Sequence, residues 1–209
     1  MKRLALLAAL FFAFVICSRA RAASPDVVIL VPGYATAAQT WGLYQPALTS
    51  QGFTVVTFDF TSPSFVDRAN QLKAVVDAQP ADARVHIIGH ASGGTIARYY
   101  LKVLGGADRV SSYAALDSGE YGNWLRCWFY GEPDMCPDSP FITTLNAGDD
   151  TPGSLPYFQY RATAKDVLDG GVWLNDRFNT NTFTIPYDMA TYSLVLSGLR
   201  GATPGVWKP

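Results

Sequence analysis

The chain has 209 residues, of which 49% are hydrophobic and 16% are charged, and its formal net charge is −1 at pH 7. Nothing in this balance forms a basic patch for nucleic acid or anionic lipid, so we expect no nucleic-acid partner. The length suits one domain with a substantial core.

The first 22 residues predict an export signal. A positive start at Lys2 and Arg3 precedes the apolar run Leu4–Ile16, and a small-x-small cleavage site ends at Ala22. The run is shorter than the about 20 residues that a spanning helix needs, which disfavours a membrane anchor. A lipoprotein anchor at Cys17 is disfavoured by the bulky residue before it. We therefore expect a secreted domain, extracellular or periplasmic, over residues 23–209 with no transmembrane segment and a net charge of about −5 from 12 basic and 17 acidic residues.

Strand and helix patterns alternate along the mature chain. Apolar, β-branched or aromatic runs predict strands over Val27–Val31, Thr54–Phe60, Val85–Ile88, Val110–Leu116, Tyr157–Ala162 and Asn181–Ile185. Helical spacing predicts helices around Trp41, Tyr44 and Leu48, and over Phe65–Ala78, Thr95–Leu104, Phe141–Asn146 and Met189–Leu199. This order predicts an α/β fold in which helices cover both faces of a mostly parallel sheet.

Two cysteines remain in the mature chain, Cys127 and Cys136, in the segment RCWFYGEPDMC. In an oxidising compartment we expect them to form a disulfide. A metal site is disfavoured because no further cysteine or histidine ligand lies nearby, and we expect no metal and no cofactor. Aromatic residues surround this loop, and we favour core positions for them over a surface that meets a partner or a lipid: Tyr121, Trp124, Trp128, Phe129 and Tyr130.

The segment VHIIGHASGGTIARYYLK, from Val85 to Lys102, predicts a strand, a tight glycine-rich turn and a helix. The pattern G-x-S-x-G places a nucleophilic serine at such a turn, but here Ala91 stands between Gly89 and Gly93. The alternative is a glycine-rich turn of any parallel α/β protein, which the earlier stretch VPGY disfavours.

Four segments resemble small secreted bacterial and actinobacterial lipases of the α/β-hydrolase superfamily: VVILVPGYATAAQTW, GFTVVTFDF, VHIIGHASGGTIARYYLK and SPFITTLNAGDDTPG. The resemblance implies a single-domain α/β-hydrolase fold with a minimal lid. It implies an oxyanion hole from the backbone amides of Tyr34 and Ser92, and an acid at Asp166. The histidine position falls at or near Tyr187.

Two of the three triad positions are therefore degenerate. The chain has only His86 and His90, both of which precede Asp166, and Ala91 has no oxygen to deprotonate. A phenol, with a pKa near 10, is a poor proton acceptor at neutral pH. We favour a lipase-like protein that has lost hydrolysis and can still bind a lipid, an ester or a partner.

Two other hypotheses stay open. One is an active carboxylic-ester hydrolase that uses unconventional residues, either Ser92 as nucleophile or Asp188 as base. For Ser92 itself we expect only a capping or solvent-facing role. The other is a structural or decoy role without any ligand.

Overall fold

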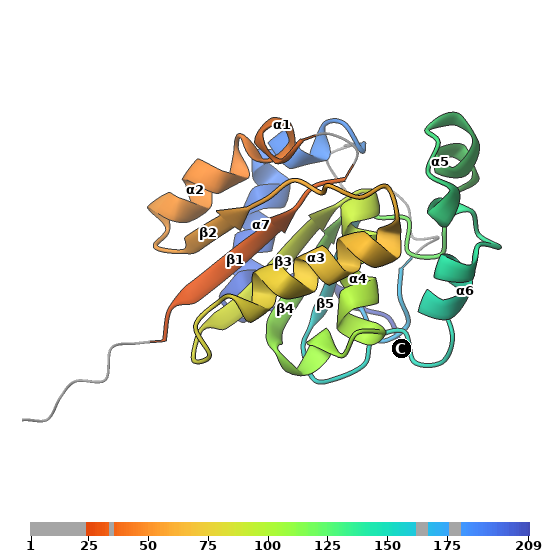
Figure 1. Cartoon of the computed structure of the whole chain (residues 1–209). Coiled ribbons are helices and arrows are strands. Elements are labelled where there is room, and N and C mark those ends of the chain that lie inside the picture. Colours follow the sequence, from red (N-terminus) through yellow and green to blue (C-terminus); the bar gives the residue numbers. More distant parts are fainter. Residues whose placement is uncertain (1–23, 34–35, 162–166, 176–180) are drawn as a thin grey trace, which may run out of the picture.

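The centre of the computed structural model, which describes residues 24–33, 36–161, 167–175 and 181–209, is a seven-stranded sheet (Figure 1). The strand order is β2-β1-β3-β4-β5-β6-β7. The strands are β1 (Asp26–Val31), β2 (Thr54–Thr57), β3 (Arg84–His90), β4 (Val110–Leu116), β5 (Tyr157–Arg161), β6 (Val172–Asn175) and β7 (Val206–Trp207). All neighbouring pairs are parallel except β6 and β7, which are antiparallel. The mostly parallel sheet confirms the predicted α/β fold.

Helices cover both faces of this sheet, as Figure 1 shows. On one face lie α3 (Phe65–Asp77), α4 (Ser92–Lys102) and α6 (Pro140–Leu145). On the other face lie α1 (Ala37–Trp41), α2 (Tyr44–Ser50) and α7 (Met189–Leu199). The remaining short elements are α5 (Trp124–Phe129), η1 (Gly106–Asp108), η2 (Pro133–Met135) and η4 (Ile185–Tyr187).

The side chains of β1 alternate between the two faces of the sheet, and both faces are buried. Val27, Ile29 and Val31 pack toward α3 and α4, whereas Val28 and Leu30 pack toward α2 and α7. Successive side chains of a strand point to opposite faces, so a strand covered on both sides shows no polar alternation.

The predicted strand over Asn181–Ile185 is wrong, because this segment is a turn that leads into η4. The Asn181 side-chain oxygen accepts hydrogen bonds from the amides of Phe183 and Thr184, at 2.9 and 3.2 Å. This local Asx turn outcompetes the β propensity of the threonines, and Pro186 has no amide for a ladder. The strand beside β5 is instead β6, which the sequence patterns did not predict.

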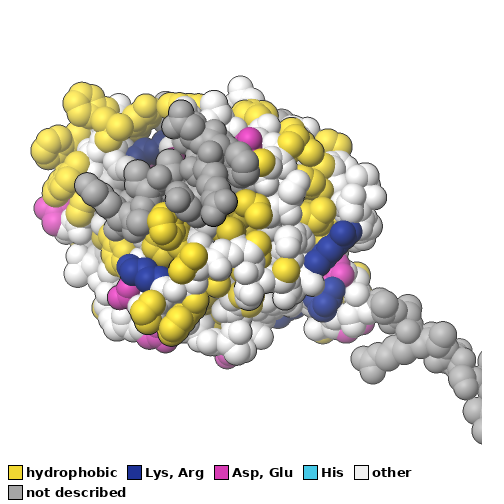
Figure 2. Space-filling view, turned by 180° about the vertical axis from the view of Figure 1, so that it is seen from behind, with side chains coloured by type: hydrophobic (Ala, Val, Ile, Leu, Met, Phe, Trp, Pro, Cys, Tyr) yellow, Lys and Arg dark blue, Asp and Glu magenta, His cyan; other side chains and the backbone are white. Residues whose placement is uncertain are grey.

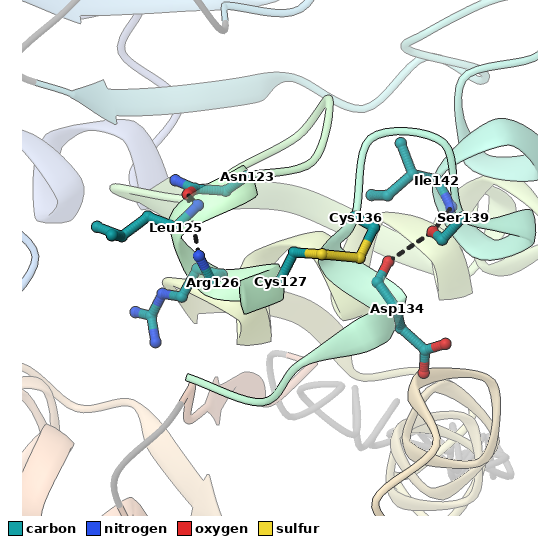
Figure 3. Close-up of a disulfide and its surroundings, with 8 residues drawn as sticks. All are labelled: Asn123, Leu125, Arg126, Cys127, Asp134, Cys136, Ser139 and Ile142. Carbon is teal, nitrogen blue, oxygen red and sulfur yellow. Dashed lines mark hydrogen bonds between the residues drawn. A yellow bond between two sulfur atoms is a disulfide. The ribbon is translucent and has the colours of Figure 1, made fainter. Parts of the chain in front are cut away.

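The disulfide between Cys127 and Cys136 is confirmed, with Cα atoms 4.8 Å apart (Figure 3). It joins α5 to the end of η2. The Asn123 side chain caps α5 by accepting from the amides of Leu125 and Arg126, at 2.9 and 3.2 Å. The loop is thus fixed by a covalent bond at its centre and by a helix cap at its start.

The expectation of core positions for the loop aromatics is wrong for three residues. Trp124, Trp128 and Phe129 are 46%, 71% and 78% exposed, because α5 turns Cys127 inward and its other face outward. Figure 2 shows hydrophobic side chains standing out at the upper left edge of the molecule, where α5 lies. Among the described helices, none has the length and hydropathy to cross a bilayer.

Candidate active site

The turn between β3 and α4 has a strained backbone at Ala91. Its φ of 51° and ψ of −129° lie outside the regions that non-glycine residues ordinarily adopt. Within the described residues only Ala91 and Asp117 combine a side chain with positive φ. A sharp strand-to-helix turn of this kind raises the residue at its apex above the sheet, which is the geometry of a nucleophile elbow.

Glycines are required around Ala91 because backbones approach closely there. A Cβ on Gly89 would lie 2.5 Å from the Cα of Gly94, and one on Gly93 would lie 2.3 Å from the Pro32 carbonyl oxygen. A Cβ on Gly33 would lie 2.9 Å from the Ala91 methyl group. The loop after β1 therefore packs directly against the apex of the turn.

Of the two residues predicted to form the oxyanion hole, the structure describes Ser92 only. Ser92 is the first residue of α4, and first-turn amides have no intrahelical acceptor, so its N–H is suited to a ligand oxygen. Tyr34 and Asp166 lie outside the described residues. Both remain predictions, although Gly33, the neighbour of Tyr34, contacts Ala91 in the position that an oxyanion loop requires.

His90 directly precedes Ala91 and is a neutral imidazole. Its Nε2 atom lies 2.7 Å from the carbonyl oxygen of Thr182, and because a carbonyl only accepts, Nε2 carries the proton. Burial lowers the pKa of His90 below its ordinary value. Its Nδ1 atom is buried and has no hydrogen-bond partner among the described residues.

Thr182 and Asp117 join this cluster, and sequence reasoning missed both. The Thr182 hydroxyl donates a hydrogen bond to the Asp117 carboxylate. Asp117 directly follows β4, the strand beside β3. Ligand-binding residues of parallel sheets gather at the carboxyl ends of strands, so a carboxylate after the strand next to the elbow was a usable signal.

Tyr187 lies in η4 and is 52% exposed. Its hydroxyl donates to the backbone carbonyl of Gln39, so the side chain crosses from η4 to α1. Thr182 also lies beside the elbow, because its carbonyl oxygen is 2.7 Å from Nε2 of His90. Thr182 is therefore a second candidate for the histidine position.

The expected capping or solvent-facing role of Ser92 is wrong. Ser92 is 1% exposed, and its hydroxyl donates to Glu132 Oε1 at 3.0 Å. Burial raises the pKa of Glu132, while Arg126, 3.8 Å from Glu132 Oε2, opposes this shift. Asp188, the other residue of the active-enzyme hypothesis, caps α7 by accepting from the amide of Thr191 at 2.5 Å.

A pocket of about 120 Å³ opens beside His90, between α1, α5 and η4. Its described lining residues are Gln39, Thr40, His90, Arg126, Thr182, Phe183, Pro186 and Tyr187. Ala91, Ser92 and Glu132 are not among these residues. Within the described part of the chain, no group of three or more histidine, cysteine or acidic side chains is placed to hold a metal ion.

Comparison with solved structures agrees with the fold. The lipase BlEst2 of Bacillus licheniformis in its propeptide form matches with a TM-score of 0.72 at 14% identity, over 90% of this chain and 53% of that one. A metagenomic carboxyl esterase matches with a TM-score of 0.51 at 15% identity, over 66% and 49% of the two chains. Tomato methylketone synthase I matches with a TM-score of 0.59 at 13% identity, over 84% and 98%.

The chain thus spans about half the length of the bacterial lipase and the metagenomic esterase. At these identities the likeness shows the fold. No curated protein matches the sequence. The family model described as "Alpha/beta hydrolase family" matches residues 28–207, which is most of the chain. The protein therefore belongs to the α/β-hydrolase family.

Proposed function

We propose that this protein is an exported, lipase-like α/β-hydrolase that has lost ester hydrolysis and keeps its pocket for an acyl or ester ligand. The observation that carries the proposal is Ala91 at the apex of an intact elbow. A methyl group has no lone pair with which to attack a carbonyl. Export is part of the proposal through the signal at residues 1–22, which lies outside the described residues, and the disulfide supports it.

The nearest alternative nucleophile is engaged elsewhere. The Ser92 hydroxyl donates to Glu132, and both side chains are buried. His90 does not supply the base, since its accepting Nδ1 atom is shielded from water. Loss of the serine or the histidine of such a triad costs on the order of 10⁶ in rate. Any residual turnover from the oxyanion amides is therefore expected to lie below ordinary detection.

A ligand role is supported by the fold relatives. Structures of tomato methylketone synthase I hold 2-tridecanone in one case and β-ketoheptanoate, in a variant of that enzyme, in another. In the present chain the pocket beside His90 is lined by Phe183, Pro186 and Tyr187 on one side. Such a wall suits an aliphatic chain.

The proposal is tested by rebuilding the triad and measuring hydrolysis of p-nitrophenyl octanoate. Ala91→Ser combined with Tyr187→His, or with Thr182→His, is expected to gain activity over Ala91→Ser alone, since a serine needs a base. The arm that gains activity identifies the lost histidine position. If neither double variant gains activity while both stay folded, the elbow is not a degenerate catalytic site and the proposal is wrong.

A second role, docking on a lipid surface, is favoured by the exposed face of α5. We name its four residues the α5 apolar surface: Trp124, Leu125, Trp128 and Phe129, which are 46–78% exposed. Exposed aromatic and aliphatic side chains on one short helix are typical of an interfacial site. The disulfide fixes the helix that presents them.

Sedimentation with phosphatidylcholine vesicles tests this role. The double variant Trp128→Ser, Phe129→Ser is expected to lower the vesicle-bound fraction at least about tenfold, because two large side chains no longer enter the lipid. The matched control Val66→Ser removes an exposed apolar side chain from α3 and is expected to bind as the unmodified protein does. Equal binding by all three proteins would exclude the α5 apolar surface as the docking site.

A further inference from the structure

The pocket beside His90 contains one permanent charge among its described lining residues, the guanidinium of Arg126. No carboxylate is among those residues. Burial lowers the pKa of His90 below its ordinary value, which favours the uncharged form of the ring. Among the described acidic groups, Glu132 is paired with Arg126, and Asp117 accepts a hydrogen bond from the Thr182 hydroxyl. The permanent charge of the described lining is therefore a cation, which an ester ligand does not require.

Arg126 donates no hydrogen bond to Glu132, its charged neighbour. Its Nη1 atom is 3.8 Å from Glu132 Oε2, which is an ion-pair distance but too long for a hydrogen bond. The guanidinium carbon lies 5.0 Å from the centre of the Tyr130 ring, which supports the cation from one side. Its side chain is only 12% exposed, so the guanidinium is largely withdrawn from bulk water.

Two constraints fix α5, the helix that carries Arg126. Residue 127, next in the chain, is bonded to Cys136, and Asn123 caps the helix start. Figure 3 shows the Arg126 side chain leaving α5 on the side away from the disulfide. A guanidinium that is already positioned and largely shielded from water binds a carboxylate more tightly than a mobile surface arginine does, because less conformational entropy is lost on binding.

The lining also provides an apolar wall and a buried acceptor. Phe183 and Tyr187 are 70% and 52% exposed and lead from the pocket to the surface. His90 is 8% exposed, and its Nδ1 atom is buried and has no hydrogen-bond partner among the described residues. The pocket thus combines a cationic side chain with exposed aromatic side chains.

We propose that the pocket binds a free carboxylic acid with an unbranched apolar tail, as its carboxylate, with Arg126 contacting the carboxylate and Phe183 and Tyr187 contacting the tail. This inference rests on the proposed function and narrows it: the ligand is the free acid and not its ester. No bond is made or broken.

Isothermal titration calorimetry of the purified protein at pH 7.5 tests the inference with octanoate and methyl octanoate, which share a tail and differ in charge. Octanoate is expected to bind at least about tenfold more tightly, equal to about 1.4 kcal/mol. Arg126→Gln is expected to remove this preference, so that octanoate binds no more tightly than methyl octanoate. Arg126→Lys is expected to restore part of the preference.

Arg200→Gln is the matched control, because Arg200 is an exposed arginine at the end of α7 that contacts Gln51. It is expected to keep the full preference. Equal binding of acid and ester by the unmodified protein overturns the inference and leaves the proposed function standing. Binding of neither compound overturns the inference, and hydrolysis of the ester during the titration overturns the proposed function.

Discussion

The helix that follows the elbow is anchored by Arg98, whose removal gives a sharp prediction. Arg98 is 0% exposed, and its Nη2 atom contacts Asp150 Oδ1 at 2.5 Å. Its Nη1 atom lies 3.9 Å from Glu120 Oε2, in a side chain that is also 0% exposed. In Arg98→Met both acidic groups lose this cation; Glu120 is fully buried, whereas Asp150 is 11% exposed and keeps Lys102 at 3.7 Å. Breaking a buried pair in this way costs about 3–5 kcal/mol.

An exposed pair of the same type provides the control. Arg84 Nε contacts Asp26 Oδ1 at 2.6 Å, but the two side chains are 60% and 29% exposed. Arg84→Met is therefore expected to cost less than about 1 kcal/mol. The two N–O distances differ by little, but Arg98 also donates to the carbonyls of Glu120 and Asp150 and to the Asn146 side chain, so the comparison reports burial together with these hydrogen bonds.

Urea unfolding and calorimetry measure both effects. With about 2–4 °C of melting temperature per kcal/mol in a domain of this size, Arg98→Met is expected to melt roughly 6–20 °C lower. Arg84→Met is expected to stay within a few degrees of the unmodified protein. Equal losses in the two variants would show that burial does not decide the strength of these pairs, and the reasoning would be wrong.

Two further predictions concern the elbow. Gly93→Ala is expected to lose at least about 2 kcal/mol of unfolding free energy, because the new methyl group would lie 2.3 Å from the Pro32 carbonyl oxygen. Gly119→Ala is the control and is expected to lose less, because its methyl group would lie 2.9 Å from the flexible end of the Met135 side chain. Similar urea midpoints for the two variants would contradict this prediction. His90 has a lowered pKa in the folded state, so its contribution to stability is present above the unfolded pKa of about 6.5 and is lost as pH falls through the lower folded value. In His90→Gln the unfolding free energy is therefore expected to fall less between pH 7.5 and 5.5 than in the unmodified protein, and a steeper fall would contradict the assignment.

The sequence predicted the architecture because its strands are buried on both faces. In β1, β3 and β4 the apolar runs coincide with the strands, and the glycines of GHASGG mark the close contacts at the elbow. Local patterns failed where a side chain competes with the ladder. At Asn181 an Asx turn replaced the expected strand, and no strand was predicted over β6.

The site was predictable only at its centre. Ala91 follows from the spacing of Gly89 and Gly93, and the structure gives it the backbone of an elbow. The cluster of His90, Thr182 and Asp117 depends on contacts over 65 and 92 residues of chain, which no local pattern specifies. The exposure of the α5 aromatics was likewise set by the disulfide loop and not by hydropathy.

With a methyl group at the apex of the elbow, the protein is expected to cleave no ester. The most direct test is the rate of p-nitrophenyl octanoate hydrolysis by the purified, unmodified protein, with heat-denatured protein as the background. We predict a rate equal to that background. Turnover above background that disappears in Ser92→Ala would contradict the claim and make Ser92 the nucleophile.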